Sequence, residues 1–136
     1  MASITRKTLV PVTSDVDILA ARQQGKTLAV EVGFSLSDLT LIMTAISELA
    51  RNIVTYAKKG EVELGLLGQG KERGIVVVAR DEGPGIADID LAMTDGYSST
   101  NSLGLGLPGA RRLMDDFEIV SKPGRGTTVT MKKWLR

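Results

Sequence analysis

The feature that most limits the possible folds is a change of periodicity near residue 60. Before it, residues 39–54 carry apolar side chains at helical spacing, which predicts an amphipathic helix packed on the core. After it, residues 61–67 alternate between charged and apolar, and residues 75–79 form an unbroken apolar run, two patterns typical of strands. Glycines within residues 68–74 predict a hairpin loop between those strands. A long helix followed by an antiparallel strand pair is therefore the predicted centre of the fold.

Further elements of the same two kinds flank this unit. A strand near the N-terminus should lie at a sheet edge, because Pro11 cannot donate a hydrogen bond to a ladder. Ser14 or Asp15 would cap the helix after it, and Ser35 or Ser37 would start the next one. The predicted elements are strands at residues 7–13, 61–67, 75–79, 117–121 and 127–134, helices from 15 to about 33, from 35 or 37 onward and over 105–116, and a flexible loop at 83–102 with one short helix near 89–93.

The order of these elements defines the fold class. Consecutive strands joined by short turns favour mostly antiparallel pairing, with the helices covering one face of the sheet. We therefore expect an α/β (α+β) two-layer sandwich. A chain of 136 residues with 43% hydrophobic content has enough apolar side chains for one core, so we expect a single domain over residues 1–136.

Composition excludes several classes of function. Cysteine and histidine are both absent, which rules out disulfides, thiolate metal sites, and a histidine base or phosphoacceptor in this chain. A net charge of +1 gives no reason to expect nucleic-acid binding. No apolar run approaches the roughly 20 residues that span a bilayer, and the N-terminus lacks the apolar segment of a secretory signal. We expect a cytoplasmic protein with no membrane partner.

Glu48 and Asn52 are four residues apart, so they lie one turn from each other on the same side of the predicted long helix. An amide oxygen suits Mg²⁺, which prefers hard oxygen ligands and keeps several waters. A carboxylate beside it could accept a proton from an attacking hydroxyl or water. The pair alone is also compatible with two solvated side chains, because both lie away from the centre of the apolar stripe.

Asp81 ends the most apolar strand and begins the sequence Asp-Glu-Gly-Pro-Gly. A carboxylate there can accept a hydrogen bond from the exocyclic amine of adenine, whereas the carbonyl of guanine would be repelled. Gly83 and Gly85 can adopt positive φ and let a flat ring approach the main chain, although these residue types also dominate ordinary turns. Thr127, at the start of the last strand, could bond the adenine edge directly or through a water.

A glycine-rich segment precedes the helix over residues 105–116. Unpaired N–H groups at a helix start favour phosphate, and glycines let phosphates come close to the main chain. The Gly-Lys-Ser/Thr ending of a Walker A loop is missing. The candidate phosphate-binding residues are Gly104, Leu105, Gly106 and Leu107, with the hydroxyls of Ser98, Ser99 and Thr100 before them.

In this order the three motifs resemble those of the GHKL ATP-binding superfamily, which has the Bergerat fold and includes histidine kinases and DNA gyrase B. Residues 48–52 are similar to its N box, residues 81–85 to its G1 box and residues 104–106 to its G2 box. The resemblance covers essentially the whole chain. It implies a mixed, mostly antiparallel sheet covered on one face by helices, and the binding of ATP with Mg²⁺.

The resemblance also implies a role for each matched residue. Asn52 would coordinate Mg²⁺, and Glu48 would act as the general base. Asp81 would bind the adenine amine, with Gly85 supporting the ring. Thr127 would complete the adenine contact. The glycine-rich segment would bind the phosphates through its main-chain amides.

Residues 86–103 would form a mobile ATP lid, and here the chain departs from what phosphoryl transfer usually uses. The lid contains no Lys or Arg, although cations on phosphate often stabilise the transition state. Arg111 and Arg112 follow the glycine run, but they lie within the next predicted helix and their direction is open. Either Mg²⁺ and main-chain amides suffice for a slow, switch-like kinase, or a partner completes the site.

Within the superfamily, a stand-alone module of this size resembles the anti-sigma-factor type of bacterial serine/threonine kinase. Residues 95–98 and 103–117 look most like the switch kinases of the stressosome. The resemblance implies phosphorylation of STAS-domain proteins, the stressosome scaffold and its antagonist, and activation of a PP2C-type phosphatase after release. Two alternatives stay open: an anti-sigma factor that sequesters an RNA polymerase sigma subunit, with kinase activity serving release, and an ATPase module whose lid closure gates partner binding.

Overall fold

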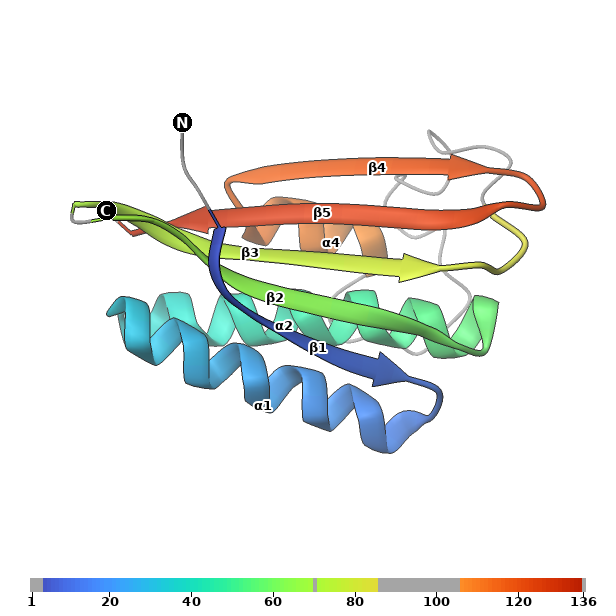
Figure 1. Ribbon diagram of the computed structural model, residues 1–136, viewed down its shortest axis with the longest axis horizontal. Coiled ribbons are helices and arrows are strands. Elements are labelled where there is room, and N and C mark those ends of the chain that lie inside the picture. Colours follow the sequence, from blue (N-terminus) through green and yellow to red (C-terminus); the bar gives the residue numbers. More distant parts are fainter. Residues whose placement is uncertain (1–3, 70, 86–105, 136) are drawn as a thin grey trace.

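The computed structural model describes residues 4–69, 71–85 and 106–135, and Figure 1 shows one sheet with the helices layered against one of its faces. The described strands lie in the order β1-β2-β3-β5-β4, and every neighbouring pair is antiparallel. The two-layer sandwich is therefore confirmed, with no parallel pair among the described strands. The elements are β1 (Ile4–Val12), α1 (Asp15–Val32), α2 (Leu36–Asn52), the π-helical turn η1 (Ile53–Ala57), β2 (Gly60–Gln69), β3 (Glu72–Asp81), α4 (Gly106–Leu113), β4 (Asp116–Lys122) and β5 (Gly126–Trp134).

The valine-rich strand β3 lies at the centre of the sheet, and β1, which contains Pro11, lies at an edge, as predicted. The last residue of β3, Asp81, is opposite Gly60 of β2 on one side and Thr127 of β5 on the other. Antiparallel pairing therefore brings the end of β3 beside the start of β5, although these segments are far apart in the sequence.

The core lies between the helices and the covered face of the sheet. Residues of β2 and β3 that alternate toward the helices are buried there, as are those of the apolar stripe on α2 and η1. The stripe is buried at Leu39, Ile42, Ile46, Leu49, Ala50 and Ile53, and half-buried at Met43 and Val54. The amphipathic helix predicted from the sequence is confirmed, and its buried face orients the polar residues at its C-terminal end.

Three predicted boundaries are wrong. The first strand, expected over residues 7–13, spans Ile4–Val12. The hairpin loop expected over residues 68–74 is much shorter, because Gly68 adopts φ +69° and both strands continue pairing to Gln69 and Glu72. The helix expected over residues 105–116 ends at Leu113. After Leu113 the main chain leaves the helix and pairs with β5, because the Asp115 N–H donates a hydrogen bond to the Lys132 carbonyl at 2.9 Å. Most of the predicted loop at residues 83–102, including its short helix, lies outside the described residues.

The start of α1 is held by Asp17 and not by the predicted cap. Ser14 occupies the N-cap position, but its side chain makes no cap hydrogen bond. The Asp17 carboxylate reaches back and accepts hydrogen bonds from the Thr13 N–H at 2.8 Å and the Thr13 hydroxyl at 3.1 Å. These bonds, the main-chain bond foremost, hold the pKa of Asp17 below its ordinary value of 3.8. At the start of α2, Ser35 does cap, accepting from the Asp38 N–H.

Replacing Asp17 by asparagine should remove a pH-dependent contribution to stability. Since the folded pKa lies below 3.8, the carboxylate favours the folded state above that pH and loses its effect as pH falls through the folded pKa. The difference in unfolding free energy between wild type and Asp17→Asn should therefore be largest above about pH 5 and shrink below about pH 3. Urea unfolding at several pH values measures it; a difference that stays constant with pH would contradict the assignment.

Candidate functional site

Glu48 projects from α2 into the protein. With 2% exposure, it is the one buried charged or polar side chain in the part of the chain that the structure describes. A carboxylate is costly to bury unless it is paired and hydrogen-bonded. The alternative of a solvated surface residue is therefore wrong for Glu48.

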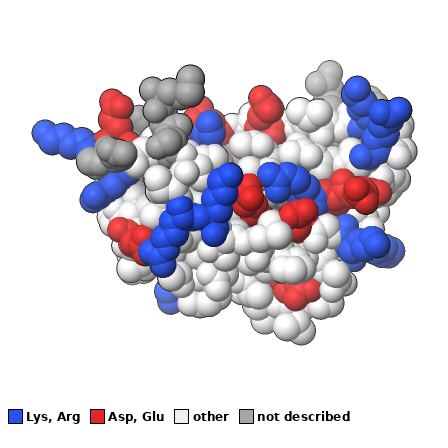
Figure 2. All heavy atoms as spheres, viewed as in Figure 1, with Lys and Arg blue, Asp and Glu red and all other residues white. Residues whose placement is uncertain are grey.

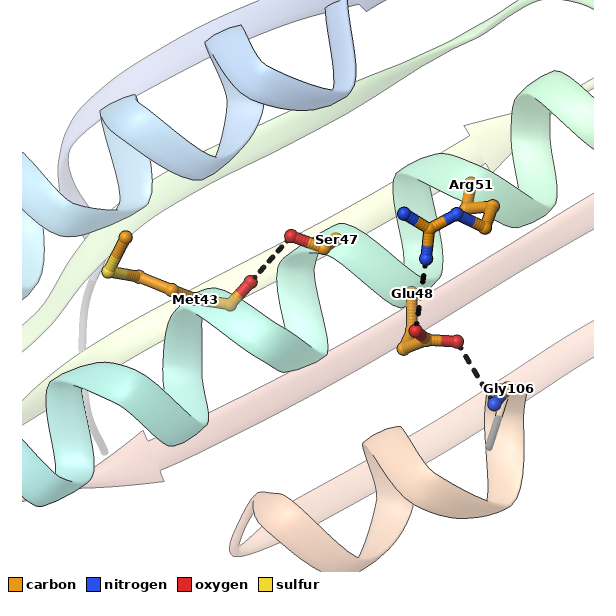
Figure 3. Close-up of polar contacts among 5 residues, drawn as sticks. All are labelled: Met43, Ser47, Glu48, Arg51 and Gly106. Carbon is orange, nitrogen blue, oxygen red and sulfur yellow. Dashed lines mark hydrogen bonds and ion pairs between the residues drawn. The ribbon is translucent and has the colours of Figure 1, made fainter. Parts of the chain in front are cut away.

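Among the described residues, two partners contact the Glu48 carboxylate, one at each oxygen (Figure 3). Oε2 accepts a hydrogen bond of 3.0 Å from the Gly106 N–H at the start of α4. Oε1 lies 3.3 Å from Nη1 of Arg51, one turn further along α2. Ser47, the preceding residue, donates instead to the Met43 carbonyl of its own helix at 2.9 Å. The carboxylate thus joins the C-terminal part of α2 to the N-terminus of α4.

Asn52 is half-buried and ends α2. The chain then widens into the π-helical turn η1, in which the Lys58 N–H donates to the Ile53 carbonyl five residues back at 2.8 Å. Such π turns within helices are frequent at functional sites. Since Asn52 follows Glu48 by one helical turn, an amide oxygen and a carboxylate lie on one side of α2 at the same end.

Asp81 leaves β3 in a tight turn that its own side chain closes. Its Oδ1 accepts a hydrogen bond of 2.9 Å from the Gly83 N–H, the pattern of an Asx turn. Gly83 packs against η1, since a Cβ added there would lie 2.6 Å from the Cβ of Ala57. The turn therefore contacts the helical segment that follows Asn52, and the first two sequence motifs come together.

The remainder of this turn packs on the connection between β4 and β5. Gly85 has φ +76°, and a Cβ added there would lie 2.2 Å from the Lys122 carbonyl oxygen. Both its conformation and its surroundings therefore require glycine. The Gly124 N–H of the connecting turn donates to the Pro84 carbonyl at 2.7 Å. Two turns at the same end of the sheet thus support each other beside Asp81.

Thr127 lies opposite Asp81 in the register of β3 and β5. Its hydroxyl is 2.8 Å from the hydroxyl of Ser121, which also donates to the Gly126 carbonyl at 3.0 Å. Ser121 is not among the residues predicted from the sequence. The available signal was the short turn between β4 and β5, which pairs Ser121 with Thr127. The predicted adenine-contacting threonine is therefore held in place by a neighbouring strand.

In the third motif, Gly106 is the first described residue, and its N–H donates a hydrogen bond to the Glu48 carboxylate. Leu107 is buried, so it can offer a ligand only its main-chain amide. Arg111 and Arg112 are exposed on α4. The predicted residues Gly104, Leu105, Ser98, Ser99 and Thr100 lie outside the described residues.

The sequence that forms α2, β3, α4 and β5 matches a known family. The family model described as "Histidine kinase-, DNA gyrase B-, and HSP90-like ATPase" matches residues 37–136. The chain belongs to this family. The match starts within α2 and runs through β5, so all three motifs of this ATPase-family chain lie inside it.

Two relatives and one solved structure agree with this assignment. Serine/threonine-protein kinase RsbT of Bacillus subtilis is 47% identical over 127 residues, which cover 93% of this chain and 96% of RsbT. An anti-sigma F factor of Clostridium kluyveri is 32% identical over 105 residues, covering 73% of this chain and 72% of that protein. The structure of the RsbU and RsbW domains of Rv1364c from Mycobacterium tuberculosis superposes with a TM-score of 0.67 at 23% identity. That match covers 97% of this chain but 33% of the solved chain, and it supports the fold alone.

These comparisons confirm the predicted superfamily and fold class. The expectation of a serine/threonine-protein kinase is confirmed by the similarity to RsbT, which extends over nearly the whole of both chains. The use of ATP follows from membership of an ATPase family. Among the described residues, no helix has the length and apolar character needed to cross a membrane.

The residues of this ATPase-family site fit Mg²⁺ only as part of a shared site. Within residues 4–69, 71–85 and 106–135, no group of three or more histidine, cysteine, aspartate or glutamate side chains could hold a metal ion. Asn52 offers one amide oxygen, and the Glu48 carboxylate is engaged by Arg51 and Gly106. A Mg²⁺ ion here would take its other ligands from nucleotide phosphates and water, as this ion commonly does.

Proposed function

We propose that this chain is an ATP-dependent serine/threonine protein kinase of a bacterial partner-switching stress pathway. The observation that carries the proposal is the buried Glu48 carboxylate at the start of α4, one helical turn from Asn52. A proton acceptor beside a metal-binding oxygen and a glycine-rich helix start is what phosphoryl transfer to a hydroxyl requires. Similarity to RsbT over 93% of the chain supports serine or threonine as the acceptor.

In the proposed reaction, the hydroxyl of a partner's serine or threonine approaches the γ-phosphorus of ATP near Glu48. A bond forms between the hydroxyl oxygen and phosphorus, the bond from phosphorus to the bridging oxygen breaks, and ADP leaves with that electron pair. The Glu48 carboxylate takes the hydroxyl proton. Mg²⁺, when bound, neutralises charge on the phosphate oxygens, and Asn52 would hold it.

The remaining proposed roles concern the nucleotide. The Oδ1 of Asp81 is occupied by the Gly83 N–H, so Oδ2 would accept the adenine amine. Gly85 and Thr127 would support and contact the ring. The phosphates would meet the main chain of Gly104, Leu105, Gly106 and Leu107 and the hydroxyls of Ser98, Ser99 and Thr100.

The proposed substrates are STAS-domain proteins, the stressosome scaffold and its antagonist, and the proposed partner after release is a PP2C-type phosphatase. We propose that residues 1–136 act in the cytoplasm as one domain. The support is the similarity to RsbT together with the similarity to anti-sigma F factors.

A second candidate function is an anti-sigma factor with kinase activity that sequesters an RNA polymerase sigma subunit. The similarity to the anti-sigma F factor of Clostridium kluyveri, at 32% identity, favours it. Both functions use the same nucleotide site and differ in the partner. Capture of a sigma subunit by the purified protein, with no STAS-domain protein or phosphatase bound, would support the second candidate.

A transfer assay with γ-labelled ATP and Mg²⁺ tests the proposal. Labelling of a serine or threonine on a STAS-domain protein in a lysate of the source bacterium is the expected result, and Glu48→Ala should abolish it. Glu63→Ala is the matched control, because it removes a glutamate from an ion pair with Arg80 on the other face of the sheet. No labelled protein, despite measurable ATP binding, would contradict the kinase proposal.

Asn52→Ala should make nucleotide binding independent of Mg²⁺. We expect Mg²⁺ to raise the ATP affinity of the wild-type protein about tenfold, since Asn52 would hold the ion and the ion would supply positive charge for the phosphates. In the variant, the affinities with Mg²⁺ and with a chelator should agree within about twofold. Calorimetric titration with ATP measures both. An unchanged response to Mg²⁺ would show that the ion is held by other groups.

A further inference from the structure

Arg51 is absent from the predicted site, yet the structure places its guanidinium on the Glu48 carboxylate (Figure 3). The two side chains differ in their surroundings: that of Glu48 is 3% exposed and that of Arg51 is 36% exposed. The arginine therefore reaches a buried anion from the rim of the site. This ion pair matters for stability, because a carboxylate left buried without its cation strongly destabilises the folded protein.

A bound nucleotide would add electrostatic repulsion between its phosphates and the Glu48 carboxylate. The Gly106 N–H, which holds Oε2, belongs to the segment proposed to meet the phosphates. A polyanion would thus arrive beside a carboxylate in a poorly solvated position, where like charges repel strongly. A cation in direct contact with the carboxylate offsets that repulsion.

The structure also describes three other arginines that are relevant to the charge of the site. Arg80 is paired with Glu61 and Glu63 on the uncovered face of the sheet, where Figure 2 shows both signs of charge intermixed. Arg111 and Arg112 are exposed on α4, and residues 86–103 contain no Lys or Arg. Among the described contacts of the Glu48 carboxylate, Arg51 is the one that brings a positive charge.

Arg51 also restricts the orientation of the base. It is three residues after Glu48, the spacing at which helical side chains meet, so the contact comes from the rigid frame of α2 itself. The second oxygen is held from a different element, α4. Because one oxygen contacts a residue of α2 and the other a residue of α4, the Glu48 carboxylate has little freedom to rotate.

We propose that Arg51 is a positioning residue for phosphoryl transfer, which holds the Glu48 carboxylate and offsets its charge so that base and phosphates occupy neighbouring positions. This inference rests on the proposed function, in which Glu48 takes the proton. It assigns to α2 itself the cation that the lid lacks.

A double-mutant cycle on nucleotide affinity tests the coupling without a phosphoacceptor. The ligand is AMP-PNP with Mg²⁺, and the variants are Arg51→Ala, Glu48→Gln and the double variant. When Glu48 is present, Arg51→Ala should weaken nucleotide binding about tenfold, because the negative charge of Glu48 is then uncompensated. In the Glu48→Gln background the same substitution should weaken binding less than about threefold. Arg22→Ala, an exposed arginine on α1, controls for the loss of one positive charge and should bind as wild type.

Arg51→Lys separates charge from orientation. Lysine keeps the charge but not the planar fork of the guanidinium, so nucleotide affinity should stay within about threefold while kcat falls more than about tenfold at unchanged KM for ATP. Should Arg51→Ala fail to fold, Arg51→Gln replaces it in the cycle. Equal losses in both Glu48 backgrounds, or no loss in either, would overturn the inference and leave the kinase proposal standing. A wild-type protein that binds no AMP-PNP would instead overturn the proposed function.

Discussion

Asp81→Asn should lower ATP affinity about 100-fold or more, the consequence of losing a charge-assisted hydrogen bond and gaining a mismatched one. The Asx turn makes the substitution informative. One oxygen of Asp81 already accepts from the Gly83 N–H at 2.9 Å. An asparagine that keeps this bond must present its NH₂ to the adenine amine, donor against donor. If it flips instead, the turn beside η1 loses its closing bond.

Calorimetry with ATP and GTP, together with an unfolding curve, checks this prediction. The wild-type protein should prefer ATP, and Asp81→Asn should lose most of that preference because the discriminating acceptor is gone. Asp116→Asn, at the start of β4 and away from the site, provides the control for charge. ATP affinity within about threefold of wild type, in a folded variant, would exclude Asp81 as the adenine contact.

Most of the fold could be predicted because its determinants are local. The stripe on α2 and the valine run of β3 are visible within a few residues, and hydrophobic periodicity reports such elements directly. The end of α4 is different. The helical pattern continues past Leu113, but the Asp115 N–H bonds to the Lys132 carbonyl of β5, a contact made only in the folded sheet. Tertiary hydrogen bonds of this kind override local propensity.

The motifs predict a set of site residues, but not how the side chains of those residues are held. Helical spacing places Glu48 off the apolar stripe, which also suits a solvated residue. Glu48 is buried because α4 covers it. Its carboxylate accepts a hydrogen bond from the Gly106 N–H, which lies 58 residues away in the sequence. Ser121 is found only from the strand register. Arg51, by contrast, could have been noticed from its spacing after Glu48.

Glu48→Gln should reduce phosphoryl transfer about 1,000-fold, within the range expected for the loss of a general base. Glutamine is nearly the same size and keeps one oxygen for the Gly106 N–H, but it cannot take the hydroxyl proton. ATP should bind at least as tightly as to the wild type, since a negative charge beside the phosphates is removed. Single-turnover transfer from labelled ATP and calorimetric titration measure the two effects separately.

Loss of transfer alone would not assign the base, because Glu48 also connects two helices. In Glu48→Gln, Arg51 at the rim of the site loses its anion and the hydrogen bond from the Gly106 N–H is weakened, and both changes loosen the start of α4 and can stop catalysis indirectly. The two roles differ in what else changes. A structural role predicts a lower unfolding midpoint and weaker ATP binding in Glu48→Gln, whereas a catalytic role predicts a folded, ATP-bound protein that does not transfer. Transfer within about tenfold of wild type would remove Glu48 from the chemistry altogether.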